Sequence, residues 1–553
     1  MIAQWVTPWL TRMVAEPNPL WTRELRQGAR IGRTPWILFA ITLVVSLLMC
    51  SIGGIAAANE ARPADIGSAL FQVFFSLAYL VVVVVGPTVA ANSVASEREG
   101  RTWEAVLLTG LTPKQIARGK FLAAYTTIGL YIVVLAPVGA LSFLFGGVGA
   151  TDVVLAFVYL FLLAGLGVAF GLAVSSLMAS LRGAIVLTLM LAVVVGPLVY
   201  FAVGFGLSFA VHGMWSEVPE GFPVWLPLAY TRASFGIEYV LFLLVLPLVV
   251  ILLPAWFLYE LTVSNLSGDG EDQSTGLKRW FCVTTPVLGA ALAVPCAVTP
   301  DDGGRMALAV TGIVAFLFYL GFAALLFAFE PAGPSRRVRI HWDRNNAGFA
   351  TRFLGPGLGR TSLLVAAVGF GGLLALAFFD MSVFQLLVTA APKKAKYTEQ
   401  VFFFALYLAP FFVFFAGLTS WLRSRGNTPW ITRIIALAVL FLAVAGPWVI
   451  AAIGGALSRH YGEDWLIIAS PSPVYAAVMV ASIDSSKSSS MPVVEAGVIC
   501  GLVWGMVGLA LLTAASRRSA RTVAQQEEAM AATEAALRAE EVEREALPSC
   551  GTP

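Results

Sequence analysis

The chain has 553 residues, of which 58% are hydrophobic and 12% are charged, and its mean hydropathy is +0.83. A soluble domain of this composition could not cover its surface with polar groups. Many apolar runs reach the roughly 20 residues that a helix needs to cross a bilayer, which predicts an all-α polytopic integral membrane protein. A β-barrel would instead show strands of about 10 residues with alternating polarity. The net charge of +3 gives no reason to expect nucleic acid as a partner.

The first 34 residues are predicted to be a cytoplasmic N-terminus that contains an amphipathic helix. Asn18 and Pro19 can start this helix, Asn as the cap and Pro in the first turn. Trp21 and Leu25 then share one apolar stripe, and the basic Arg23 and Arg26 lie beside it. The segment is either a helix lying in the cytoplasmic interface or an ordinary basic flank that obeys the positive-inside rule. Since charged residues precede the first apolar run, we expect no signal peptide, and the first membrane helix would act as the targeting signal.

About twelve spans are predicted, in two sets of six. The first set lies in a membrane domain over 35–263, with spans at 35–57, 67–94, 121–145, 152–179, 183–211 and 237–262. A polar linker at 264–280 follows. The second membrane region, 281–515, has spans at 281–299, 306–329, 362–388, 401–421, 432–456 and 494–515. The tail, 516–553, is rich in Ala, Glu and Arg and is predicted to be a polar helix.

Lys and Arg in the short loops place both termini in the cytoplasm. The basic cluster at Lys393, Lys394 and Lys396 falls on the opposite side, which makes 389–400 the weakest part of this topology. A short similarity links Thr22-Arg23-Glu24-Leu25 with Thr351-Arg352-Phe353-Leu354, each just before a predicted span. It indicates either a degenerate second half or a chance match.

The sequence predicts no catalytic, metal or nucleotide site, so we do not expect the chain to be an enzyme by itself. The histidines are far apart in predicted loops, which supports neither a metal site nor a His-based relay: His212, His341 and His460. The cysteines are scattered without a CxxC pair, and two of them share one predicted helix: Cys282 and Cys296. No phosphate-binding GxxxxGK[ST] loop occurs, because Phe121 follows Gly119 and Lys120.

Carboxylates deep inside a span often relay protons or coordinate sodium. Here the candidates fall at or near predicted span ends: Asp152, Glu238, Glu260, Glu330, Asp380 and Glu495. This placement argues against an ion-coupled carrier. The spans are rich in Gly, Ala, Phe and Leu, which suits an apolar or amphipathic cargo but equally suits helix packing through small residues.

A densely charged segment separates the second and third spans. If Arg101 to Thr109 is helical, Arg101 and Glu104 share one face, while an apolar face carries Trp103, Val106 and Leu107. Such a short amphipathic helix beside the membrane could receive a push from a cytoplasmic partner. Alternatively, the segment is a loop whose charges pair with one another.

Two motifs resemble those of type-2 ABC exporter permeases. The family's coupling-helix signature, between the second and third spans, is similar to the series Glu97, Glu99, Thr102, Glu104, Leu107, Leu108, Leu111, Ile116, Gly119 and Lys120. The family's elbow helix before the first span is similar to Asn18, Pro19, Arg23, Glu24, Leu25 and Arg26. The resemblance covers residues 17 to about 262. Two features depart from it: Gly110 stands where the family usually has Pro, with Pro113 displaced, and the last six spans carry no second acidic signature.

The resemblance implies a permease subunit of an ATP-driven exporter in the bacterial cytoplasmic (inner) membrane. It would bind no cofactor directly, because ATP and Mg would be held by a separate ABC ATP-binding subunit. The coupling residues would be Glu97, Glu99, Arg101, Thr102, Trp103, Glu104, Leu107, Leu108 and Lys120, with the carboxylates and Arg101 paired to charges on the ATPase and Trp103 anchoring the helix. The elbow residues, Asn18, Pro19, Trp21, Arg23, Glu24 and Arg26, would contact the first spans and membrane lipid.

The resemblance leaves the cargo and the number of chains in the pore open. One chain could form the pore, or two could associate as a homodimer or with a second permease. The alternative function is an ATP-independent polytopic carrier or a membrane assembly platform.

Overall fold

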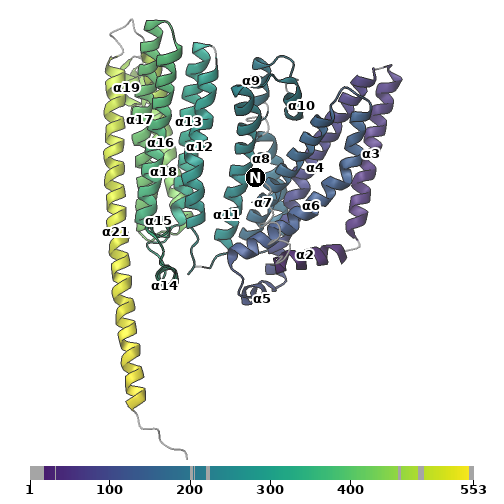
Figure 1. Cartoon of the computed structure of the whole chain (residues 1–553). Helices are drawn as coiled ribbons and strands as arrows, with labels where there is room; N and C mark the ends of the chain where they lie inside the picture. The colour runs from purple at the N-terminus through teal and green to yellow at the C-terminus, as the bar shows by residue number, and fades with distance from the viewer. Residues whose placement is uncertain are drawn as a thin grey trace, which may run out of the picture. The chain divides into compact units, whose positions relative to one another are not determined.

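The computed structural model of the chain (Figure 1) is all-helical over the residues that it describes, which are 18–30, 33–60, 62–199, 204, 206–218, 224–268, 270–299, 301–458, 463–483 and 491–546. Twelve helices in this part of the chain are long and apolar enough to span a membrane. The prediction of an all-α, multi-pass membrane protein with about twelve spans is therefore confirmed. The chain divides into two compact units, Met1–Asp269 and Gly270–Pro553, each with six of these helices.

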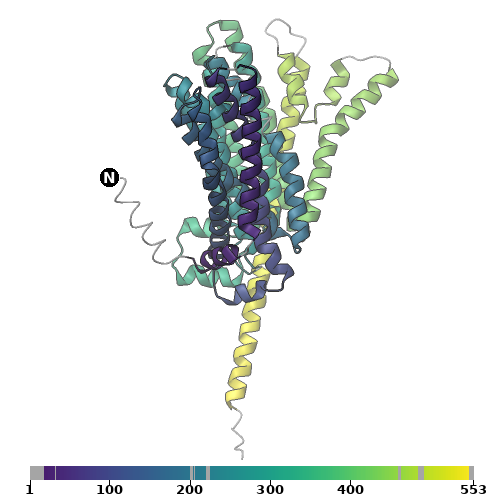
Figure 2. The ribbon, with the colours of Figure 1, turned by 90° about the vertical axis from the view of Figure 1, so that its right-hand side faces the viewer.

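The described part of the first unit starts with a short helix and then combines long spans with short connecting helices. Its elements in order are α2 (Pro19–Arg30), α3 (Arg33–Ala58), α4 (Pro63–Glu99), α5 (Trp103–Leu108), α6 (Pro113–Leu144), α7 (Ala150–Leu177), α8 (Leu181–Val199), α9 (Gly206–Met214), α10 (Trp225–Arg232), the π-helical η2 (Tyr239–Val245) and α11 (Leu246–Leu266). Helix α2 lies crosswise at one end of the long helices, and α5 lies beside it at the same end (Figures 1 and 2).

Two helices of this unit differ from the predicted spans. The expected fifth span, 183–211, corresponds to α8, described to Val199, and α9, described from Gly206, and most of the residues between them lie outside the described part of the chain. The coupling helix was predicted near 97–110, but α4 continues through Glu99, so Glu97 and Glu99 lie on the last turn of α4. Nothing in the sequence interrupts α4 before Gly100, since Ser, Glu and Arg are tolerated in helices.

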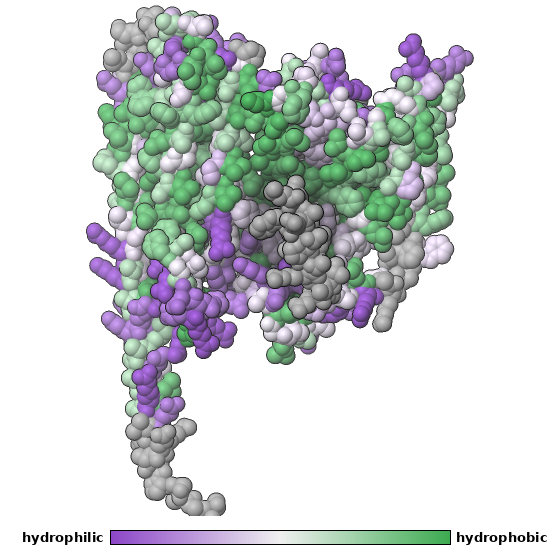
Figure 3. Space-filling view, viewed as in Figure 1, coloured by the Kyte–Doolittle hydropathy of each residue, from purple (hydrophilic) through white to green (hydrophobic). Residues whose placement is uncertain are grey.

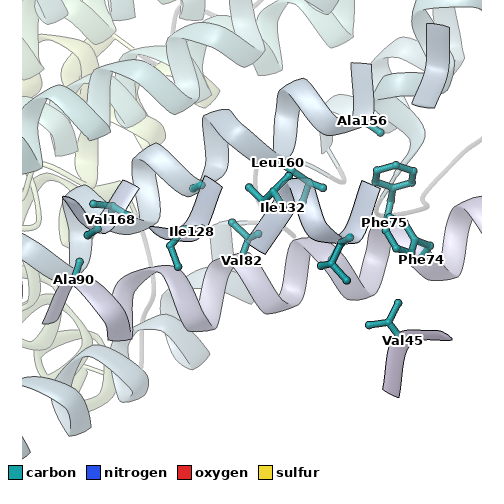
Figure 4. Close-up of a cluster of buried hydrophobic side chains, with 14 of the residues drawn as sticks. Val45, Phe74, Phe75, Val82, Ala90, Ile128, Ile132, Ala156, Leu160 and Val168 are labelled. Carbon is teal, nitrogen blue, oxygen red and sulfur yellow. The ribbon is translucent and has the colours of Figure 1, made fainter. Parts of the chain in front are cut away.

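The core of the first unit lies between α3, α4, α6 and α7. The side chains labelled in Figure 4 meet there: Val45, Phe74, Phe75, Val82, Ala90, Ile128, Ile132, Ala156, Leu160 and Val168. Glycine allows α7 to touch α4 closely, because a Cβ at Gly171 would come within 2.0 Å of the Pro87 carbonyl oxygen. Small residues commonly permit such contacts between membrane helices. The α4–α7 pair thus forms a rigid centre for the elements at its ends.

The second unit has its own helical core. Its elements are α12 (Thr275–Val298), α13 (Asp302–Leu326), η3 (Phe327–Phe329), α14 (Arg336–Arg344), α15 (Phe349–Leu354), α16 (Leu358–Leu387), α17 (Ala391–Ser424), α18 (Pro429–Ser458), α19 (Glu463–Ile468), α20 (Tyr475–Ser482) and α21 (Met491–Ala546). Helix α17 is the most deeply buried of the spans and packs along α21. Close approach is again through glycine, since a Cβ at Gly508 would lie 2.5 Å from the Phe414 nitrogen.

Two polar regions of the second unit, the tail after 516 and the segment 389–400, can be compared with the prediction. Hydrophobic residues cover the middle of the long helices, while hydrophilic residues gather over α14 and along the far part of α21 (Figure 3). Helix α21 has 56 residues and is about 84 Å long, far more than the roughly 30 Å of a bilayer core. The predicted polar tail helix therefore continues the last span. The segment 389–400, which was the weakest part of the predicted topology, is helical from Ala391, so its three lysines lie on the first turns of α17.

The predicted loop placement of the histidines is wrong for two of them. His212 lies in α9 and His341 in α14, and His460 lies outside the described residues. Cys282 and Cys296 share α12, as expected. No group of three metal-binding side chains occurs in the part of the chain that the structure describes.

Candidate functional site

The first turn of α2 is fixed to α6 through Asn18. The Asn18 side chain caps α2, because its Oδ1 accepts a hydrogen bond from the Leu20 N–H at 3.0 Å. Its Nδ2 donates to the Gln115 carbonyl oxygen at 2.8 Å. A Cβ at Gly119 would lie 2.6 Å from Asn18 Oδ1 and 2.9 Å from Leu20 Cβ, so the contact requires glycine at this position. One residue therefore both starts α2 and holds it to α6.

Four charged side chains from three helices meet beside this contact. Lys120 on α6 is fully buried, and its Nζ lies 2.9 Å from Glu97 Oε2 and 3.3 Å from Glu24 Oε1. Arg23 NH2 lies 3.1 Å from Glu97 Oε1. Lys120 also donates to the Ser93 carbonyl oxygen at 2.8 Å. We call Arg23, Glu24, Glu97 and Lys120 the ion-pair cluster.

The ion-pair cluster links α2, α4 and α6 in one electrostatic unit. Glu97 is only 7% exposed and Lys120 is not exposed at all, so both charges have lost most of their hydration. Charges buried in this way are tolerated only when they are paired and hydrogen-bonded. Separation of any one of the three helices from the others would leave a charge unpaired. We therefore expect the three helices to move together.

The last turn of α4 also holds α7 and α8. Arg98 donates from NH1 to the Ser176 and Met178 carbonyl oxygens, at 2.8 and 3.3 Å, at the end of α7. Glu99 Oε2 accepts from the Leu181 N–H at 2.7 Å. A carboxylate is favourable there, because Leu181 starts α8 and the start of a helix carries partial positive charge. Arg98 has a structural function that the sequence reasoning missed, although it lies inside the charged segment.

Helix α5 begins two residues later than the predicted Arg101–Thr109 helix. Arg101 has a φ of 55° and lies before the helix, so the predicted shared face of Arg101 and Glu104 is not formed. Thr102 connects α5 back to α4, since both its N–H and its Oγ1 donate to the Glu97 carbonyl oxygen, at 2.9 and 3.3 Å. A reversal of chain direction at Arg101 thus places α5 directly beyond the last turn of α4.

One side of α5 is anchored and the other is exposed. Val106 is buried, and Trp103 packs against the core of the unit with the Arg98 guanidinium 5.7 Å from its ring. Leu107 and Leu108 are 48% and 87% exposed. Arg101 and Glu104 are exposed as well. The outer face of α5 therefore combines two leucines with charges of both signs, a combination suited to a protein surface.

The end of α5 and the start of α6 explain the departure from the family pattern. Gly110 has a φ of +71°, which proline cannot adopt because its ring fixes φ near −65°. Pro113 is the first residue of α6, where a missing N–H costs nothing. Thr112 caps this helix, and Gln115 completes a capping box with it. The displaced Pro113 therefore starts α6 rather than ending α5.

The structure separates the predicted coupling residues into two groups. Glu97, Glu99 and Lys120 make internal contacts, whereas Arg101, Glu104, Leu107 and Leu108 are presented outward. Among the elbow residues, Trp21 Nε1 lies 3.4 Å from Thr126 Oγ1 on α6, and Arg26 is exposed in an open groove with Pro19. The contacts of this arrangement are suited to transmitting a displacement. A displacement of α5 would be carried into α4 by Thr102 and into α6 by the short connection at 109–112.

The second unit contains another buried Lys–Glu pair, but not a second copy of this site. Lys278 Nζ lies 2.5 Å from Glu330 Oε1, and Glu330 also accepts from the Gly357 N–H at 3.1 Å. Arg352, the counterpart of Arg23 in the short sequence similarity, is instead 3.1 Å from the exposed Asp343. The contacts of Arg352 thus differ from those of Arg23, and a common origin of the two halves remains a prediction.

No model of a known protein family matches the chain, and no curated protein matches it. The fold and the geometry of α2, α4, α5 and α6 thus carry the functional argument, together with the resemblance of the two motifs.

Proposed function

We propose that this membrane protein is the permease subunit of an ATP-driven ABC export system, with ATP and Mg bound by a separate ATP-binding subunit. The observation that carries the proposal is the construction of α5. It is anchored by Val106 and Trp103 and presents Leu107 and Leu108 outward at the same end of the unit as α2. Two exposed leucines beside Arg101 and Glu104 suit a docking surface, which combines apolar groups with charges.

The partner surface that fits α5 is a groove on the ATP-binding subunit with apolar walls and charged edges. Leu108, the most exposed of the two leucines, would enter the groove, while Arg101 and Glu104 would pair with charges at its rim. Rim charges contribute mainly to orientation and association rate, and buried apolar anchors contribute most of the affinity. Glu97 is assigned an internal function instead, because it is paired with Lys120 and Arg23.

Transmission would follow the contacts of α4 and α6. When ATP binding brings two ATP-binding subunits together, their movement would push on α5. The push would reach the last turn of α4 through Thr102 and the start of α6 through Thr112. The ion-pair cluster would make α2 follow, and Arg98 and Glu99 would pull the ends of α7 and α8. Five helices would then shift as one body, which is the kind of motion that alternates access between two membrane faces.

The first test is the purification of the tagged full-length chain from its own membranes in mild detergent, with partners identified by mass spectrometry. We expect an ATP-binding subunit to accompany the native chain. Leu108→Glu and the double change Arg101→Glu with Glu104→Arg should release it. Glu99 is left unchanged because it also contacts α8.

The matched control is Glu528→Arg, a charge reversal at an exposed position on the far part of α21. It should retain the ATP-binding subunit. Recovery of no ATPase with the native chain in several mild detergents would refute the proposal. Retention of the ATPase by both α5 variants would exclude α5 as the docking element. If no ATPase is recovered, the favoured function becomes an ATP-independent carrier, which the buried carboxyl group of Asp380 would suit.

A further inference from the structure

An unpaired carboxyl group lies inside the second unit. Asp380 is on α16 and is 1% exposed. It precedes Leu387, the last residue of α16, by seven residues, which at about 1.5 Å per residue is a depth of about 10 Å. The sequence placed Asp380 near a span end and so outside the set of deep carboxylates. The structure leaves it two turns from that end, and among the described residues no N–H or O–H group donates to either of its carboxylate oxygens.

The neighbours of Asp380 come from the end of α12 and the start of α13. The buried Cys296 thiol on α12 lies beside the carboxyl group. Cys296 Sγ is 3.6 Å from the Arg305 carbonyl oxygen on α13. The Arg305 side chain is 8% exposed and lies 3.1 Å from Asp302 Oδ1, while its Nε has no partner among the described groups.

Several charged groups lie on the first turns of α17, which reach this end of α16 because Gln385 Nε2 donates to Thr398 Oγ1 at 3.1 Å: Lys393, Lys394, Lys396 and Glu399. Helix α16 packs against α12, α13, α15, α17 and α21. On α17, Tyr397 packs at a tilt against Phe384, one turn beyond Asp380, with ring centroids 5.4 Å apart. Glu495, near the start of α21, is exposed. Arg352 on α15 belongs to the opposite end of α16, because α15 directly precedes that helix.

An ionised carboxylate is costly in these surroundings. Moving a charge into an apolar interior without hydrogen bonds or an opposite charge costs several kcal/mol, and the group avoids the cost by binding a proton. A sodium ion is the other candidate, but it requires several oxygen ligands. Asp380 supplies two oxygens, and the thiol of Cys296 is a poor ligand for a hard cation. The surroundings therefore favour a proton.

We propose that Asp380 is a proton-binding site of the second unit, coupled to the separation of α16 from α12 and α13. In the closed arrangement the site holds the neutral acid, Asp380–COOH. When the three helices separate and water enters, the acid releases one proton to water and leaves the carboxylate, which the entering water hydrates. Binding and conformation are linked reciprocally, so a rise in pH favours the open arrangement and opening favours proton release.

Proton binding at Asp380 would not depend on ATP coupling. It would make the second unit of an ATP-driven exporter sensitive to the proton gradient, and in an ATP-independent carrier it would supply the driving ion. Water would reach the site from the end of α16 opposite to α15.

The test uses the full-length chain reconstituted in lipid vesicles and labelled with a membrane-permeant maleimide across a pH series. Labelling is measured for each cysteine by peptide mass spectrometry, and the rate at Cys296 is divided by the rate at Cys282 on the same helix. This ratio removes the ordinary increase of thiolate with pH. Release of one proton on opening predicts that the ratio rises about tenfold per pH unit in the native chain.

The neutral variant Asp380→Asn should give a flat ratio, while Glu495→Gln, the control at an exposed position, should retain the native profile. Infrared spectra of the same samples should contain a protonated-carboxyl band that disappears with rising pH and is missing in Asp380→Asn. If Asp380→Asn does not fold, Asp380→Glu replaces it and should shift the band. A ratio with the same pH profile in the native chain and in Asp380→Asn would overturn the proposal, as would a native infrared spectrum without such a band at every pH tested.

Discussion

The ion-pair cluster predicts a large loss of stability when Glu97 loses its charge. In Glu97→Gln the fully buried Lys120 keeps its charge but loses its closest counter-ion, at 2.9 Å. Breaking a buried pair by removing one partner costs about 3–5 kcal/mol. Lys120 would retain Glu24 at 3.3 Å and the Ser93 carbonyl oxygen, so we expect the lower end of this range. The Arg23 contact adds only about 0.2–1 kcal/mol, because the Arg23 side chain is 42% exposed.

The measurement is unfolding of the purified protein in detergent, titrated with a denaturing detergent and followed by tryptophan fluorescence. Glu97→Gln should lower the free energy of unfolding by about 3 kcal/mol. The matched control is Glu104→Gln, seven residues away on the exposed face of α5, which should change it by less than about 0.5 kcal/mol. Equal effects of the two variants would show that Glu97 is not held as described.

A double-mutant cycle separates the pair from its surroundings. Lys120→Met alone leaves Glu97 with only the half-exposed Arg23, whereas the double variant removes both buried charges and leaves Arg23 and Glu24 able to reach water. We expect the double variant to be about 2 kcal/mol more stable than the sum of the single changes implies. Additive effects would refute a direct interaction between Glu97 and Lys120.

Three further predictions follow from the elements around the cluster. Gly119→Val should displace the first turn of α2 and destabilise the first unit by about 1–3 kcal/mol, because its Cβ would overlap Asn18 and Leu20; a change below 0.5 kcal/mol in the same unfolding assay would show that α2 yields freely. Thr112→Ala removes the cap of α6 and should cost about 1 kcal/mol, whereas Thr112→Ser should be neutral; equal losses would mean that the hydroxyl is not the stabilising group. Leu108→Glu should leave the free energy of unfolding unchanged, because Leu108 is 87% exposed. The same change should lower the amount of co-purified ATP-binding subunit at least about tenfold, which corresponds to a loss of about 1.4 kcal/mol of binding free energy. Parallel losses of stability and binding would indicate a folding defect instead.

Composition and hydropathy alone determined the class of this protein. Runs of apolar residues long enough to cross a bilayer predict spanning helices, because an unpaired backbone in lipid is too costly for any other local structure. The start of α2 at Asn18 and Pro19, and the persistence of the polar tail as a helix, follow from local capping and propensity rules. The sequence also singled out the segment 97–120, because it places many charges between two apolar spans in a chain that is only 12% charged.

The tertiary structure decided what each of those charges does. Glu97 and Glu104 lie in one short charged segment, yet one is buried against Lys120 and the other is exposed, since α4 continues through Glu99 before the chain turns at Arg101. Arg23 and Lys120 are 97 positions apart in the sequence, and no local pattern brings both of them to Glu97. Asp380 shows the same limit: distance from a span end could be estimated from the sequence, but burial without a partner depends on α12 and α13 packing against α16. Local sequence sets helix type and length, whereas desolvation and pairing of charges are properties of the packed helices.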